Sequence, residues 1–184
     1  MLFPNLEVFI DGGGNSRAWV QRTMRTLPTF HKVYVFEPNP KFHASYDQSN
    51  FSLIKKAIWT TDCHLPFYVS KDERQVGSSL LQEKLCKVDG AIVPNWYDEP
   101  LQVECINFSR WLETLPLYYS LTLKLDIEGA EYDVLSQMIE CGTIRRVKKL
   151  FVEFHLETLR EKQTQHDKLI QALRDCGIEP HHWD

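Results

Sequence analysis

Short apolar runs recur along this chain and are separated by stretches with helical periodicity. Apolar runs bounded by polar or glycine residues are typical of buried strands, whereas apolar residues three to four positions apart are typical of helices. The pattern predicts strands over 6–11, 33–36, 51–59, 101–106, 121–126 and 147–155, and helices over 16–27, 40–46, 129–140 and 165–176, with a short helix up to 115. Residues 65–69 either pair with the third strand or extend the sheet. This alternation predicts an α/β protein with a mostly parallel sheet flanked by helices.

Residues 71–100 interrupt this alternation with a segment of weak pattern. Glycines and prolines punctuate the segment, and long loops inside compact domains are often functional. Asn95, Trp96 and Tyr97 lie in it. Aromatic faces beside an amide suit a sugar, although a packed aromatic that anchors a long loop explains them equally well. We therefore expect a single domain over 1–184 in which residues 71–100 form a lid or a substrate-binding excursion.

Composition and charge narrow the class of protein. Hydrophobic residues make up 43% of the chain, which is ample for a packed core and excludes disorder over most of its length. The net charge of −4 argues against a dedicated nucleic-acid binder, which would usually be basic. The five cysteines form no CxxC pair, so they indicate reduced core residues rather than a zinc cage or a redox motif. No signal peptide and no membrane-length apolar run is visible, and we expect a cytoplasmic protein.

The first three predicted strands end in residues suited to a nucleotide, because ligands of parallel sheets bind beyond the carboxyl ends of the strands. Strand one ends in Asp11-Gly12-Gly13-Gly14-Asn15, where glycines allow a ligand to approach closely or simply allow a flexible turn. Glu37 follows strand two, 26 residues after Asp11, where an acid can bind both hydroxyls of a ribose. A solvated surface glutamate is the alternative. Ala57-Ile58, at the end of strand three, can flank an adenine ring or belong to ordinary core.

Acidic residues and a histidine follow the last two long strands. Asp126, Glu128 and Glu131 lie where a helix begins, and the helix N-terminus explains Glu131 well. It explains Asp126 less well, because an ionised group at the end of an apolar strand needs a partner. Alternation places Glu153 and His155 on the same side of the final strand. A carboxylate and an imidazole at the mouth of a sheet are candidates for proton transfer, although a satisfied structural histidine is the default for a single residue.

Four motifs taken together carry a family resemblance. Asp11-Gly-Gly-Gly-Asn15, Val35-Phe-Glu-Pro-Asn-Pro40, Lys124-Leu-Asp-Ile-Glu-Gly-Ala-Glu-Tyr132 and Val152-Glu-Phe-His155 occur in this order over most of the chain. They resemble the FkbM family of S-adenosylmethionine-dependent methyltransferases. The resemblance implies a class I methyltransferase fold, a Rossmann-like sheet with an antiparallel strand near its C-terminal end. It also implies methyl transfer, most often to a hydroxyl of a sugar or a secondary metabolite.

The resemblance also implies roles for individual residues. Asp11, Gly13 and Asn15 would line the methionine part of the cofactor, with Gly12 and Gly14 in the same loop. Glu37 would hold the ribose hydroxyls, and Pro38, Asn39 and Ala57 would lie near the adenine. Asp126 and Glu128 would lie beside the sulfonium and the acceptor. Ser79 belongs to a serine-bearing stretch, Ser78-Ser79-Leu80, that resembles one in the family and is expected to touch cofactor or substrate.

The chain departs from the family pattern in three places. The first motif of the family usually has a glycine two residues after its asparagine, where this chain has Arg17. The usual segment before the first strand is missing, and residues 178–184 supply one strand at most, so the C-terminal strand pair is curtailed. We expect a minimal version of the fold, one domain of a larger protein, or a homo-oligomer whose partner covers the exposed sheet edge.

These residues predict an O-methyltransferase that acts on a sugar or glycan hydroxyl, with no nucleic-acid or membrane partner. His155, oriented by Glu153 or Asp126, is the expected general base, and Asp126 is the competing candidate. A further hypothesis is a Mg²⁺ or Mn²⁺ ion held by Asp126, Glu128, Glu153 and His155, although no metal is favoured. The alternatives are O-methylation of a non-sugar metabolite and a non-catalytic cofactor-binding domain. A dinucleotide enzyme is disfavoured because the chain lacks GxGxxG.

Overall fold

A computed structural model describes residues 5–159 and 163–183, and its centre is a six-stranded sheet. The strand order is β11-β10-β9-β1-β2-β3, and each neighbouring pair is parallel. The strands are β1 (Leu6–Gly12), β2 (Lys32–Phe36), β3 (Ser52–Ile54), β9 (Tyr119–Leu125), β10 (Val147–Val152) and β11 (Pro180–His182). The predicted parallel α/β sheet is therefore confirmed.

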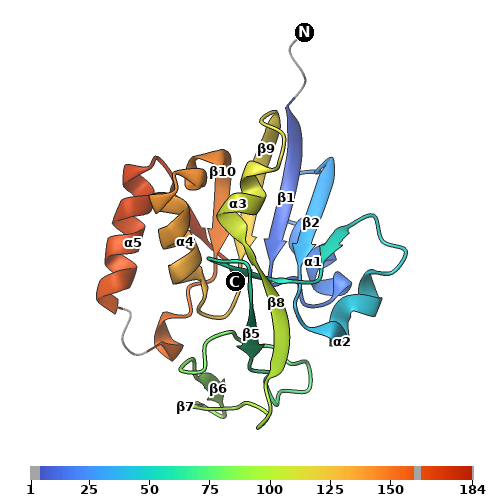
Figure 1. Cartoon of the computed structure of the whole chain (residues 1–184), viewed down its shortest axis with the longest axis vertical. Coiled ribbons are helices and arrows are strands. Elements are labelled where there is room, and N and C mark those ends of the chain that lie inside the picture. Colours follow the sequence, from blue (N-terminus) through green and yellow to red (C-terminus); the bar gives the residue numbers. More distant parts are fainter. Residues whose placement is uncertain (1–4, 160–162, 184) are drawn as a thin grey trace.

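Helices cover the two faces of this sheet (Figure 1). The large core lies under α3, α4 and α5, whose apolar side chains pack on alternate residues of β1, β9 and β10. A smaller core lies on the opposite face, where Val20 of α1 and Tyr46 pack against Phe9, Val33 and Val35. The helices are α1 (Arg17–Met24), α2 (Pro40–His43), α3 (Phe108–Glu113), α4 (Glu131–Glu140) and α5 (Gln163–Asp175), with 3-10 turns η1 (Ala44–Tyr46), η2 (Thr143–Arg146) and η3 (Leu156–Thr158).

Helix ends follow the capping residues in the sequence. The Asn107 side chain caps α3 by accepting a hydrogen bond from the Arg110 amide at 3.0 Å. Gly177 follows α5 with a φ of +80°, and the Ile178 amide donates back to the Leu173 carbonyl at 2.9 Å. A glycine in the left-handed conformation is a common way to end a helix.

The third predicted strand is wrong as a single element. Residues 51–59 form β3 in the main sheet and β4 (Ala57–Trp59) in a second sheet, whose order is β4-β8-β5. The chain leaves the main sheet at Lys55-Lys56, and Lys56 forms an ion pair with Glu104 of β8 (Leu101–Asn107). Strand β5 (Cys63–Phe67) pairs antiparallel with β8, which is where predicted strand 65–69 belongs. Apolar periodicity alone does not reveal which partner a strand chooses.

The last strand also differs from what the family resemblance implies. Within the described residues, β11 pairs parallel with β10, and the six-stranded sheet holds no antiparallel strand. Helix α5 carries the chain back to the end of the sheet at which β10 starts, and a strand reached by such a crossover runs parallel. An antiparallel neighbour would need a further turn after β11.

The excursion over 71–100 lies beyond the carboxyl ends of the main strands (Figure 1). It contains a hairpin of β6 (Cys86–Val88) and β7 (Ala91–Val93). Two bridges hold it to the segment after β5, Tyr68 with Ser79 and Ser70 with Trp96. No helix in the described part of the chain is long and apolar enough to cross a membrane.

Candidate active site

An open cleft of about 1850 Å³ lies at the carboxyl ends of the main strands. Its walls come from the loops after β1, β2, β9 and β10, from β4, and from the excursion. Small-molecule pockets usually measure roughly 300–1000 Å³, so this cleft has room for two ligands side by side. The site residues predicted from the sequence that line this cleft are Asp11, Gly13, Gly14, Asn15, Glu37, Pro38, Asn39, Ala57, Asp126, Glu128, Glu153 and His155.

At Gly13 and Gly14, the loop after β1 lies so close to β2 and to the residue after β9 that there is no room for a β-carbon. Gly13 has a φ of +81°, and a Cβ atom there would lie 1.9 Å from the Asp126 carbonyl oxygen. A Cβ at Gly14 would lie 2.1 Å from Cγ1 of Val35. The glycine run therefore lets this loop pass between β2 and β9, which brings its backbone to the floor of the cleft. Gly12, by contrast, ends β1 and does not line the cleft.

Glu37 is a buried carboxylate at the end of β2. Its Oε2 accepts a hydrogen bond from the Asn15 amide and its Oε1 accepts one from the Asn39 amide, both at 2.7 Å. Burial raises the pKa of Glu37 to about 8, and the two amide hydrogen bonds oppose this rise only in part. Each carboxylate oxygen has a second lone pair, so Glu37 can still accept two hydroxyl donors from the cleft.

Lys124 is a buried ammonium on β9 that sequence reasoning did not single out. Its Nζ lies 3.1 Å from Oδ1 of Asp11 and 3.3 Å from Oδ2 of Asp126. Burial alone would lower the pKa of Lys124, but the two carboxylates outweigh it and raise that pKa. Lys124 thus joins the acids that end two neighbouring strands. The rule that an ionised group in an apolar strand needs partners would have identified it.

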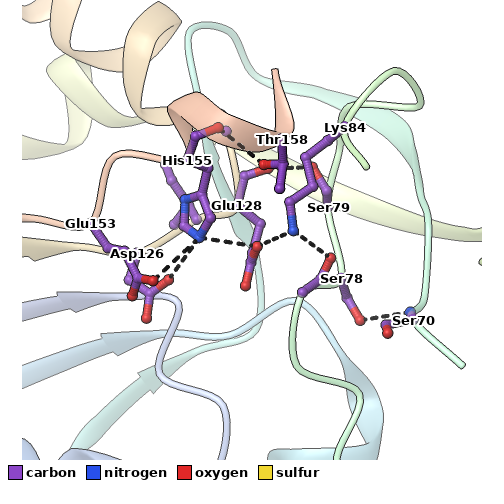
Figure 2. Close-up of polar contacts among 12 residues, drawn as sticks. Ser70, Ser78, Ser79, Lys84, Asp126, Glu128, Glu153, His155 and Thr158 are labelled. Atoms are coloured by element: carbon purple, nitrogen blue, oxygen red, sulfur yellow. Dashed lines mark hydrogen bonds and ion pairs between the residues drawn. The ribbon is translucent and has the colours of Figure 1, made fainter. Parts of the chain in front are cut away.

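His155 contacts four carboxylates from three segments, and Figure 2 shows three of them, Asp126, Glu128 and Glu153, on one side of its ring. Its Nε2 is 3.1 Å from Oε2 of Glu128 and 3.8 Å from both Oδ1 of Asp126 and Oε1 of Glu153. Its Nδ1 is 3.2 Å from Oε1 of Glu131. The structure therefore brings all four predicted catalytic residues together, and adds Glu131 on the far side of the ring.

Glu131 binds the loop between β9 and α4 as well as the histidine. Its carboxylate is fully buried and accepts hydrogen bonds from the Ile127 amide at 2.7 Å and the Gly129 amide at 2.8 Å. The expected helix-terminus role of Glu131 is present, because it lies in the first turn of α4. Its contact with His155 was not predicted. That contact joins two strand ends that lie far apart in sequence.

The protonation of the cluster follows from these contacts. Burial would lower the pKa of His155, but Glu131, Glu128 and Asp126 together raise it to about 9. His155 therefore carries a proton at neutral pH. The pKa of Glu153 is also raised, first by burial and then by the nearby Asp126 carboxylate.

The excursion contributes a second buried ammonium. Lys84 is 3% exposed and forms an ion pair with Oε2 of Glu128. No sequence pattern marked Lys84, because it lies in a segment with weak periodicity. Ser79 is fully buried, and its hydroxyl donates to the Glu128 carbonyl at 2.7 Å instead of lining the cleft. Ser79 was expected to touch cofactor or substrate, but in the structure it contacts Glu128 and does not line the cleft.

Three of the four residues proposed as metal ligands lie close enough to one another to share one metal ion. One ligand atom each from Asp126, Glu128 and His155 lie within 4.8 Å of one another, and Glu153 is outside this group. Glu128 already has the Lys84 ammonium as a partner, and Asp126 has that of Lys124. A metal would also have to displace the proton on His155.

The aromatic residues of the excursion differ in exposure. Trp96 packs beside Tyr68, with ring centroids 6.4 Å apart, and the Lys84 ammonium lies 5.8 Å from its ring. Tyr97 is 49% exposed, and Asn95 lines the cleft. Trp96 thus anchors the excursion, while Asn95 faces the space where a second ligand would lie.

Comparisons with known proteins agree with this geometry. The model of the methyltransferase FkbM domain family matches residues 13–180. No curated protein matches the chain in a sequence comparison. Among solved structures, a crystal structure of methyltransferase FkbM from Methylobacillus flagellatus KT is similar, with a TM-score of 0.53 and 11% identity. That match covers 94% of this chain and 39% of the other, so it supports the fold and spans less than half of that protein.

Proposed function

This chain belongs to the FkbM methyltransferase family, and we propose that it transfers a methyl group from S-adenosylmethionine to a hydroxyl of a sugar or glycan. The observation that carries the proposal is one cleft with two chemically different ends. At one end Glu37 suits the ribose of a nucleoside, and at the other end His155 lies among carboxylates suited to proton transfer. A methyl transfer to an alcohol needs both.

The residues at the first end fit the cofactor. Glu37 is a buried carboxylate in the wall of the cleft with spare acceptor capacity, which suits the two hydroxyls of a ribose. Asp11, Gly13 and Asn15 would hold the methionine part, and Asn39 and Ala57 would lie near the adenine. When bound, S-adenosylmethionine supplies a methyl group that its sulfonium already activates.

The chain itself has two tasks, to align the acceptor and to accept its proton. Proximity and orientation contribute up to about 7–11 kcal/mol in favourable intramolecular reactions. The pKa of His155 near 9 makes its imidazole a poor proton acceptor at neutral pH. We therefore assign the base to Asp126, which is 26% exposed at its side chain and lies 3.8 Å from Nε2 of His155. Protonated His155 then orients Asp126 and Glu128.

The pH profile distinguishes the two bases. With Asp126 as the base, turnover has a plateau at neutral pH and falls as His155 loses its proton near pH 9. With His155 as the base, turnover rises through the same pH range. His155→Ala should reduce turnover in either case, while the affinity for cofactor survives because His155 lies at the other end of the cleft.

A labelled-methyl transfer screen over free and nucleotide-linked sugars tests the proposal directly. We expect label in at least one sugar with the wild type and a loss of 10²-fold or more with Asp126→Asn. Glu113→Gln on α3, an exposed position outside the cleft, is the control. Label only in non-sugar alcohols would retain methyl transfer and reject the sugar. If no acceptor is labelled and no cofactor binds, the chain is a non-catalytic domain.

A metal-assisted version of the reaction is the competing mechanism. The Asp126, Glu128 and His155 group has suitable proximity, but two lysines and a proton already balance its charges. We expect turnover after EDTA treatment to equal that of the untreated protein. A loss that Mg²⁺ or Mn²⁺ restores would instead assign these three residues as metal ligands.

A further inference from the structure

Glu128 has a backbone conformation that needs outside support. Its φ is +57°, in the left-handed region that a residue with a β-carbon rarely adopts, and Gly129 follows with a φ of +105°. A residue held there is strained and persists only where its surroundings fix it. Contacts from other parts of the chain must therefore hold Glu128 in this conformation.

Residues 79–85 of the excursion, here named the clamp segment, contact Glu128 at both its backbone and its side chain. The Ser79 hydroxyl donates to the Glu128 carbonyl at 2.7 Å, and the Lys84 ammonium pairs with Glu128 Oε2. Leu81 packs on the next residue, because a Cβ at Gly129 would lie 3.2 Å from Leu81 Cδ1. The clamp segment therefore makes three separate contacts with the turn after β9.

The clamp segment also holds the segment that bears His155. The Leu85 amide donates to the Thr158 carbonyl at 3.1 Å. The Thr158 hydroxyl in turn donates to the His155 carbonyl at 3.0 Å. Figure 2 shows these contacts meeting around Glu128 and His155. One segment thus connects two catalytic candidates that come from different strands.

Lys84 and His155 share a single oxygen of Glu128. Lys84 Nζ and His155 Nε2 both contact Oε2, the histidine at 3.1 Å. The Lys84 ammonium is further fixed by the Gly77 carbonyl, which accepts a hydrogen bond from it at 3.3 Å. One carboxylate oxygen of Glu128 therefore contacts both the Lys84 ammonium and the His155 imidazole, and His155 lines the cleft.

We propose that Ser79 and Lys84 are positioning residues, which fix Glu128 and thereby orient His155 for the transfer reaction. The inference rests on the proposed function for the meaning of that orientation. The positioning itself is measurable without any acceptor. The excursion is then part of the active centre and not only a cover over it.

Ser79→Ala and Ser78→Ala form a matched pair that tests the backbone contact. Ser78 is the neighbouring serine. Its hydroxyl donates a hydrogen bond to the Gln75 carbonyl and accepts one from the Ser70 amide, and it makes neither of these bonds to Glu128. The readout is the titration of the His155 imidazole by NMR. Displacement of Glu128 removes one carboxylate from beside Nε2, so Ser79→Ala should lower the pKa of His155 by about 0.5 unit or more, a threefold change in proton affinity. Ser78→Ala should match the wild type.

Lys84→Met and Lys87→Met form the second pair, which keeps the test decisive if Ser79→Ala fails to fold. Lys87 belongs to the same excursion, but its side chain is 67% exposed and its ammonium lies 4.0 Å from Oε2 of Glu157. Hydrogen exchange at the Ile127 and Gly129 amides should accelerate at least tenfold in Lys84→Met and stay unchanged in Lys87→Met. Lys84→Arg, which keeps the charge, should restore protection in part.

The outcomes separate this inference from the proposed function. Unchanged His155 titration in Ser79→Ala, or unchanged exchange in Lys84→Met, would overturn the positioning role. Calorimetry with S-adenosylhomocysteine reports on the function instead, and the wild type should bind it whatever the His155 titration and the exchange rates of the variants show. A wild type that does not bind it would reject the proposed function while leaving the positioning result intact.

Discussion

At the scale of single residues, burial and neighbouring charges set the chemistry of the cleft. Glu37 and His155 both have pKa values raised into the range near 8 to 9, but for opposite reasons. Burial favours the neutral form of Glu37, whereas the surrounding carboxylates favour the charged form of His155. Each shift has a consequence that solution experiments can measure.

The pKa of Glu37 predicts that cofactor affinity depends on pH. Ribose hydroxyls that donate to the carboxylate favour its ionised form, so binding lowers the pKa of Glu37 and releases a proton. Affinity for S-adenosylhomocysteine should therefore rise from pH 6 and reach a plateau above about pH 8. Glu37→Gln should abolish this dependence and bind about 10–100-fold more weakly, as expected for a lost hydrogen bond to a charged group. A wild-type affinity that does not change over this range would contradict the ribose assignment.

The pKa of His155 predicts a stability that declines with pH. The folded state raises this pKa from 6.5 to about 9, so the stabilisation is complete below pH 6.5 and disappears as the pH rises through 9. The shift corresponds to at most about 3 kcal/mol. Denaturant unfolding between pH 6 and 10 should show a larger loss in the wild type than in His155→Gln, which keeps the decline that the raised pKa of Glu37 causes up to about pH 8. Parallel curves for the two proteins would argue against the charged histidine.

At the scale of elements, the junction between β9 and α4 matters most. Glu131 connects three parts of it, since it accepts two loop amides and contacts the His155 ring while lying in the first turn of α4. This one carboxylate makes the loop geometry and the histidine orientation depend on each other.

Glu131→Gln is expected to affect both properties at once. The amide can accept only through one oxygen, so a buried loop amide loses its partner, which costs about 1–3 kcal/mol of unfolding free energy. The pKa of His155 should fall because its nearest buried carboxylate is gone. Chemical denaturation and NMR titration measure the two effects. A variant as stable as the wild type, with an unchanged histidine titration, would show that Glu131 acts only as a helix-terminal charge.

The elements that the sequence predicts well are those decided by local chemistry. The strands predicted at 6–11, 33–36 and 121–126 match β1, β2 and β9 closely, with only residue 126 outside its strand. The break at Lys55-Lys56 was missed because the choice of sheet partner depends on residues far along the chain. Lys84 and the histidine contact of Glu131 were missed for the same reason.

At the scale of the whole molecule, the parallel sheet gathers the strand-end motifs into one cleft. Four motifs that span the chain meet there, and this is why their order in the sequence indicated a site before any geometry was known. The family match and the similar FkbM crystal structure agree with that arrangement.

Calorimetric titration with S-adenosylhomocysteine shows whether this cleft binds S-adenosylmethionine through Glu37. We predict one site per chain with micromolar affinity in the wild type, weaker binding in Glu37→Gln, and wild-type binding in Glu113→Gln. NAD should not bind. Binding of NAD in place of S-adenosylhomocysteine, or no binding of either ligand, would contradict the account.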